Sequence, residues 1–267
     1  MLIPPESYLR RMQAALSART RLELDAIVFA SDVISICYSR LESLAEPQML
    51  ARLGEYERVS AIADAWTVID NIHVIRQLFW KSRKGEMGPQ TGAWHAATES
   101  ASLLRNGMDH VASNLNNLAK RTGAPPPALG ALFIQHTTTD PAPAITCLTM
   151  TAGNCTGGTG FNGPVIDTLA ITDGVVVELE AFGHRCSLTA AVISLAPLLT
   201  VMATRVEADV HRSLVEQNLS PESDVNARAV LPTQTVLVTQ LSLGPLGGLV
   251  IDEVVDRKRG TLKVRRR

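Results

Sequence analysis

Three consecutive prolines at positions 125–127, two residues after Gly123, constrain this chain of 267 residues more than any other feature. Proline has no backbone N–H and clashes with the preceding turn, so a helix cannot continue through this stretch. Before it, apolar residues recur at helical spacing. After it come short runs rich in β-branched residues, separated by turn signals. The sequence therefore predicts a helical region at 1–122 and a strand-rich domain at 123–267.

The first region shows three helical patterns. Apolar residues at three-to-four spacing predict a helix over 19–44 and a long second helix over 48–81, beginning after Pro47. The segment 84–92 holds three glycines and one proline, so it is expected to be a connector. A third helix is predicted over 94–120. Together these patterns indicate an antiparallel, up-and-down helical bundle.

The second region mixes strands with one helix. Strands are predicted over 129–137, 145–151, 165–171 and 175–182, with a hairpin signal at 172–174. A helix is predicted over 187–217, and three short strands follow at 235–243, 249–255 and 261–265. The predicted class is therefore mixed: a helical bundle followed by an α+β domain with a mainly antiparallel sheet.

Charge and cysteine usage narrow the class of protein. A formal net charge of -1 excludes a uniformly basic nucleic-acid binder. The four cysteines form no CxxC pair and no zinc-type spacing, and the chain lacks a signal-peptide pattern, so reduced thiols in a cytoplasmic protein are expected. The apolar run 188–203 falls short of the roughly 20 residues that a membrane crossing needs. It is expected to be a buried core helix.

The segment Leu104–His110, with the sequence LRNGMDH, holds the candidate catalytic residues. On a helix, Asn106 and His110 share one face at i,i+4, and Arg105 and Asp109 form a second such pair. The intervening glycine costs about 1 kcal/mol of helix propensity relative to alanine, which indicates a packing or functional reason for a small residue. The spacing also fits a solvated ion pair beside a surface histidine.

This segment, in the last long helix of a small helical bundle, resembles the Arg-polar-x-x-x-His motif of the HEPN superfamily. The resemblance covers residues 19–120 and implies a metal-independent endoribonuclease that acts as a homodimer on RNA. By that resemblance His110 is the general acid or base, Arg105 stabilises the phosphoryl charge, and Asn106 orients the imidazole or bonds the phosphate. Asp109 departs from the active pattern, because it competes with phosphate for the arginine.

A second function stays open: a non-catalytic dimerisation module, with the C-terminal domain binding a ligand or protein partner. A GxGxxG pattern at 158–163 precedes a predicted strand and not a helix, so no dinucleotide cofactor is expected. The histidines form no metal pattern, and no metal is expected. Basic residues at 257–259 and 263–267 fit either a solvated tail or contact with an RNA backbone.

Overall fold

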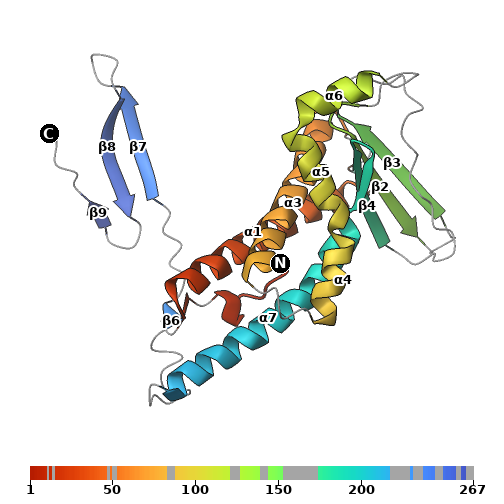
Figure 1. Ribbon diagram of the computed structural model, residues 1–267. Coiled ribbons are helices and arrows are strands. Elements are labelled where there is room, and N and C mark those ends of the chain that lie inside the picture. The colour runs from red at the N-terminus through yellow and green to blue at the C-terminus, as the bar shows by residue number, and fades with distance from the viewer. Residues whose placement is uncertain are drawn as a thin grey trace.

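The computed structural model describes residues 1–10, 12–13, 16–46, 49, 53–82, 88–120, 127–138, 144–152, 174–216 and four C-terminal strand segments. The helices are α1 (Ala18–Ser43), α3 (Glu55–Ser82), α4 (Pro89–Ala97), α5 (Glu99–Asp109), α6 (Val111–Ala119) and α7 (Leu188–Glu216), with a 3-10 turn η1 at Tyr8–Arg10. The larger sheet consists of β2 (Ala131–Thr138), β3 (Ala144–Thr151), β4 (Gly174–Ala181) and β5 (His184–Ser187). Figure 1 shows this sheet at one end of the helices.

Helices α1 and α3 pack against each other as a pair. The predicted first helix is confirmed, and its start is capped by Ser17, whose hydroxyl accepts the Thr20 N–H at 3.1 Å. The second helix begins later than predicted, at Glu55. There the Glu57 carboxylate accepts the Gly54 N–H at 3.0 Å, as in a capping box, and fixes the start of the helix.

The prediction of one continuous third helix was wrong, because the chain breaks at Thr98 and at His110 into α4, α5 and α6. At the first break the buried Thr98 hydroxyl accepts a 2.6 Å hydrogen bond from Arg76 of α3. At the second, the Asn114 side-chain amide donates to the carbonyl oxygen of Gly107 at 2.8 Å. At each junction a side chain thus donates a hydrogen bond to an oxygen near the helix end.

The larger sheet is antiparallel throughout, in the order β3-β2-β4-β5. Its central strand β2 is buried from Ala131 to Ile134. Strands β2, β3 and β4 confirm three predictions, whereas the strand predicted at 165–171 and its hairpin lie outside the described residues. The short strand β5 was not predicted. It follows a two-residue turn in which Phe182 and Gly183 both have positive φ, at 54° and 85°.

The core spans residues on both sides of the predicted domain boundary. One cluster of buried apolar side chains joins Ile34 of α1, Ile69 of α3 and Leu198 of α7. In addition, the Tyr38 hydroxyl of α1 and the Thr189 hydroxyl of α7 lie 2.8 Å apart, and burial raises the pKa of Tyr38 to about 12. The boundary at 122–127 lies almost wholly outside the described residues, so the division into two domains stays a prediction, as does the bundle arrangement.

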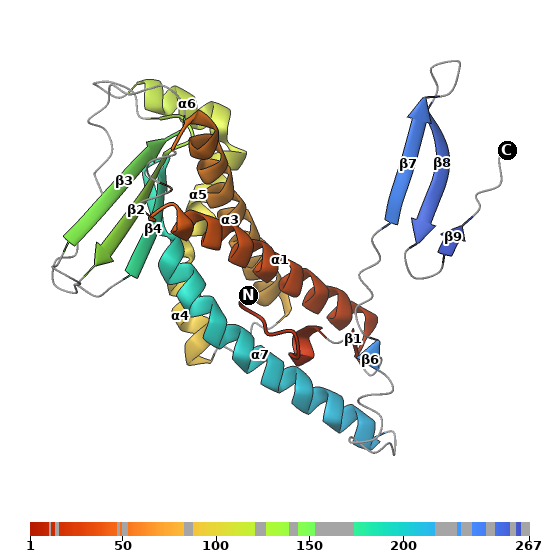
Figure 2. The ribbon, with the colours of Figure 1, turned by 180° about the vertical axis from the view of Figure 1, so that it is seen from behind.

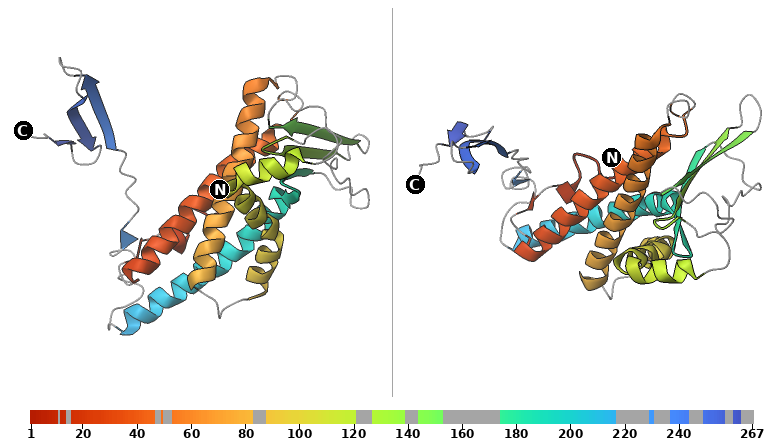
Figure 3. Two further views of the ribbon diagram at one scale, coloured as in Figure 1. Left: turned by 45° about the horizontal axis from the view of Figure 1, so that its top comes forward. Right: turned by 90° about the horizontal axis from the view of Figure 1, so that it is seen from above.

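Helix α7 runs alongside the other helices, as the rear view in Figure 2 and the two views in Figure 3 show. Its side chains Leu195, Leu198 and Val210 are buried in the shared core. By length and composition alone this helix could also cross a membrane, a property that core helices share.

The C-terminal strands β7 (Leu237–Leu243), β8 (Leu249–Asp256) and β9 (Gly260–Leu262) form an antiparallel three-stranded sheet, close to the predicted positions. A two-stranded ladder pairs β1 (Met12–Gln13) with β6 (Ala229–Val230).

Candidate functional site

The three predicted site residues lie at the end of α5. Arg105 and Asn106 are within the helix, whereas His110 is the junction residue between α5 and α6, with φ -111° and ψ 31°. Its N–H donates to the carbonyl oxygen of Asn106 at 3.2 Å. The side chains of Asn106 and His110 are exposed, and that of Arg105 is half-buried. The histidine is therefore open to solvent and not packed in the core.

Arg105 is held by two carboxylates. Its Nε lies 2.7 Å from Asp70 of α3, and its Nη1 bonds to Asp109, one turn further along α5. The predicted i,i+4 pair is confirmed, while the contact to Asp70 was not predicted. Among the residues that the structure describes, neither Asn106 nor His110 bonds to this guanidinium through its side chain. The guanidinium of Arg105 is thus paired with the carboxylates of both Asp70 and Asp109.

A pocket of about 280 Å³ lies beside this cluster, between α3, α4 and α5. It is lined by five polar side chains: His73, Arg76, Gln77, His95 and Ser102. The Nη1 of Arg76 donates to the carbonyl oxygen of His95 at 2.8 Å as well as to Thr98. The Nε2 of His73 lies 3.4 Å from the Gln77 amide nitrogen, so one polar wall is formed by successive turns of α3.

Both imidazoles of this pocket favour the neutral form. Burial, and then the charge of Arg105, lowers the pKa of His73. Burial and the charge of Arg76 lower the pKa of His95 in the same way. A neutral imidazole can accept a hydrogen bond or a proton at pH 7, so the pocket can hold a polar group that carries donors or a transferable proton.

The sequence predicted no site at His73, Arg76 or His95. Their apolar neighbours on α3, Trp66 and Ile69, are buried in the core. The polar residues instead follow one stripe of α3. A run of Asp70, His73, Arg76 and Gln77 at helical three-to-four spacing was the signal that pointed to a polar face.

Gly107 is the small residue of the motif, and it packs against the ring of Phe182. A Cβ built on Gly107 would lie 2.9 Å from Cγ of the Phe182 ring and closer still to its Cδ2. The ring also contacts Trp66 of α3, with centroids 6.2 Å apart. Glycine at this position lets α5 approach Phe182, in the turn between β4 and β5.

The GxGxxG segment at 158–163 and the basic residues at 257–259 and 263–267 lie outside the described residues. Within the described ranges, no three His, Cys, Asp or Glu side chains lie close enough together to hold a metal ion. Cys37, Cys147 and Cys186 are free thiols.

Comparison of the chain with protein families, with curated proteins and with solved structures gives no match. Any functional assignment must therefore come from the side chains on α3, α4 and α5.

Proposed function

We propose that this protein is a HEPN-like, metal-independent endoribonuclease in which Arg105, Asn106 and His110 act on RNA within a homodimer. The observation that carries the proposal is the break between α5 and α6. It leaves the imidazole of His110 exposed, five residues from an arginine that is itself partly open to solvent. A second copy of the same face would complete the site, because one arginine and one histidine are a small catalytic set.

The chemistry needs one base, one acid and one cation. His110 takes the proton of a ribose 2′-hydroxyl, and the 2′-oxygen then attacks the adjacent phosphorus. The bond from phosphorus to the 5′-oxygen then breaks. The imidazolium formed at His110 returns its proton to that oxygen, which leaves a 2′,3′-cyclic phosphate and a 5′-hydroxyl. Arg105 stabilises the charge on the non-bridging oxygens, for which its fork of donors is suited.

The ion pairs of Arg105 do not prevent this role. The side chains of Asp70 and Asp109 are 54% and 53% exposed, and exposed pairs contribute only about 0–1 kcal/mol each. A phosphate can therefore replace one carboxylate at small cost. The remaining negative charge still weakens the approach of RNA, so the resting site is inhibited by its own aspartates.

The test is cleavage of a labelled RNA in the presence of a chelator. His110→Ala and Arg105→Ala should abolish cleavage, whereas Asp109→Asn should raise it, most strongly at low salt. Arg19→Ala is the matched control, since Arg19 also forms an i,i+4 ion pair with a carboxylate, that of Glu23. Cleavage that persists in both site variants, or falls in Asp109→Asn, would contradict the mechanism.

A second candidate is a non-catalytic dimerisation protein. It is favoured by the two carboxylates on Arg105 and by a stripe on α1, where Leu22, Phe29 and Ile36 are 69%, 69% and 56% exposed at seven-residue spacing. Such a protein would cleave no RNA. Its mass in solution would be that of a dimer, and Phe29→Glu would return it to a monomer.

A further inference from the structure

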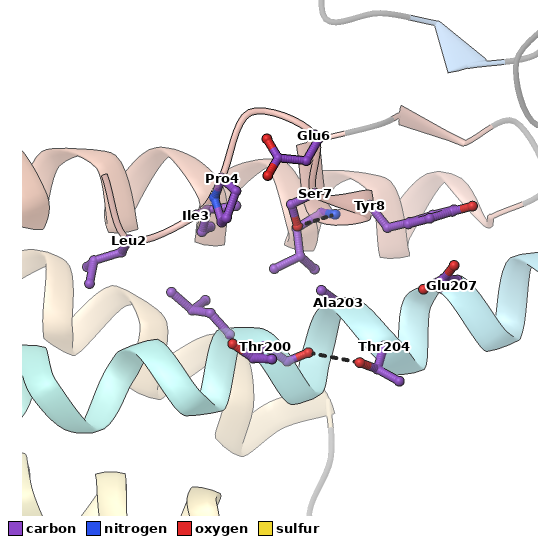
Figure 4. Close-up of a pocket in the computed structure, with 12 residues that line it drawn as sticks. Leu2, Ile3, Pro4, Glu6, Ser7, Tyr8, Thr200, Ala203, Thr204 and Glu207 are labelled. Atoms are coloured by element: carbon purple, nitrogen blue, oxygen red, sulfur yellow. Dashed lines mark hydrogen bonds between the residues drawn. The ribbon is translucent and has the colours of Figure 1, made fainter.

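The N-terminal segment Leu2–Leu9 lies along α7, and together they border an open pocket of about 260 Å³. Figure 4 shows Glu6, Ser7 and Tyr8 on the side of the segment, and Thr200, Ala203, Thr204 and Glu207 on the side of the helix. The pocket is built from elements that the proposed ribonuclease site does not use. At roughly 30 Å³ for each water-sized group, it has room for about eight non-hydrogen atoms.

The N-terminal wall of this pocket is fixed in place by Arg10. The guanidinium donates to both carboxylate oxygens of Asp32 on α1, at 2.8 and 2.6 Å, and to the carbonyl oxygens of Ile3 and Pro4. The side chains of Ile3 and Leu9 are buried in the core. Because the backbone of the segment is held by these contacts, the pocket is formed before any ligand arrives.

The polar groups of the pocket present lone pairs and negative charge. The hydroxyls of Thr200 and Thr204 use their protons on helix carbonyl oxygens, at 3.1 and 3.3 Å, which leaves their oxygens as acceptors. Glu207 adds a carboxylate from the helix side, whereas the Glu6 carboxylate is turned away from α7 (Figure 4). Among the described residues neither glutamate forms an ion pair, and the pocket lining includes no lysine, arginine or histidine.

The apolar walls complete the description of the ligand. Leu2 and Leu199 line the cavity together with the ring of Tyr8, so the body of a ligand would be apolar. The threonine acceptor oxygens and the Glu207 carboxylate would select a positively charged donor at its end. We propose that this pocket binds a small organic ammonium compound, with an aliphatic body of about six carbons.

The first experiment is calorimetric titration of the full chain with n-hexylammonium. 1-Hexanol is the uncharged probe of the same length, and hexanoate carries the opposite charge. Saturable binding of the ammonium, at least tenfold tighter than that of the alcohol, with no binding of hexanoate, is expected because charged hydrogen bonds are stronger than neutral ones. Equal affinity for the ammonium and the alcohol would overturn the proposal.

Variants then locate the binding. Glu207→Gln should weaken n-hexylammonium binding roughly three- to tenfold, and Ala203→Leu should abolish it by filling the cavity. Asp209→Asn is the matched control, since it removes the same charge from α7 outside the pocket lining and should leave the affinity unchanged. Melting curves establish that each variant is folded. Undiminished binding in folded Ala203→Leu, or equal losses in Glu207→Gln and Asp209→Asn, would overturn the assignment.

Discussion

Gly107→Ala is expected to destabilise the protein although it introduces the best helix-forming residue into α5. The new methyl group would lie 2.9 Å from Cγ and 3.2 Å from Cβ of Phe182. At these distances the ring and the helix cannot both keep their positions. Overpacking of this kind costs about 1–3 kcal/mol, and the gain in helix propensity is about 1 kcal/mol. The free energy of unfolding should therefore fall by about 0–2 kcal/mol.

Gly92→Ala provides the comparison that isolates the steric effect. Gly92 lies within α4, and nothing comes within 4 Å of a Cβ built on it. The same substitution there should stabilise the protein by about 1 kcal/mol. At about 2–4 °C per kcal/mol for chains of about this size, Gly92→Ala should melt above the wild type and Gly107→Ala at or below it.

A double variant tests the named contact directly. In a Phe182→Ala background the ring is gone, so Gly107→Ala should become stabilising, and the two substitutions should show strong coupling in a thermal-denaturation cycle. The reasoning is refuted if Gly107→Ala raises the melting temperature as much as Gly92→Ala does. It is also refuted if the effect of Gly107→Ala is the same with and without the ring.

Three further measurements follow from the fold. Gly130→Ala should lower the melting temperature strongly, because Gly130 has φ 92° and an added Cβ would lie 2.7 Å from a β4 side chain; an unchanged melting curve would contradict this. Tyr38→Phe should cost about 0.5–1.5 kcal/mol in urea unfolding through the lost bond to Thr189, and Thr189→Val should cost more, because the same hydroxyl also accepts the Val177 N–H at 2.8 Å. Since the pKa values of His73 and His95 are lowered in the folded state, the unfolded chain binds protons first as pH falls below about 6.5, so the melting temperature should drop from pH 7 to pH 5.5. A variant with both histidines replaced by glutamine should show a flatter profile, and an equal slope would rule out their contribution.

Much of the secondary structure is readable from the residues alone. The helical repeat of apolar side chains places α1 and α7 within a residue or two of their observed ends, since burial on one face of a helix imposes that spacing. The pair between Arg105 and Asp109 is equally local. Both features depend only on residues within about four positions of each other, and the sequence contains them directly.

The interrupted third helix shows where such reasoning stops. Nothing in the local pattern ends a helix at Thr98, since the apolar repeat continues beyond it. The helix breaks where Arg76 of α3 donates to the threonine hydroxyl and to the carbonyl oxygen of His95. A side chain from another element thus takes part in the junction, and propensity within one segment does not predict it.

The Leu104–His110 segment divides in the same way. Its residues determine that a helix carries an arginine beside an i,i+4 carboxylate and that the glycine between them has a packing or functional reason. Only the packed structure decides that Asp70 is the second partner of Arg105, that Phe182 packs against the glycine, and that the helix ends at His110. These contacts join residues far apart in the chain, and their geometry depends on how the helices and the sheet share one core.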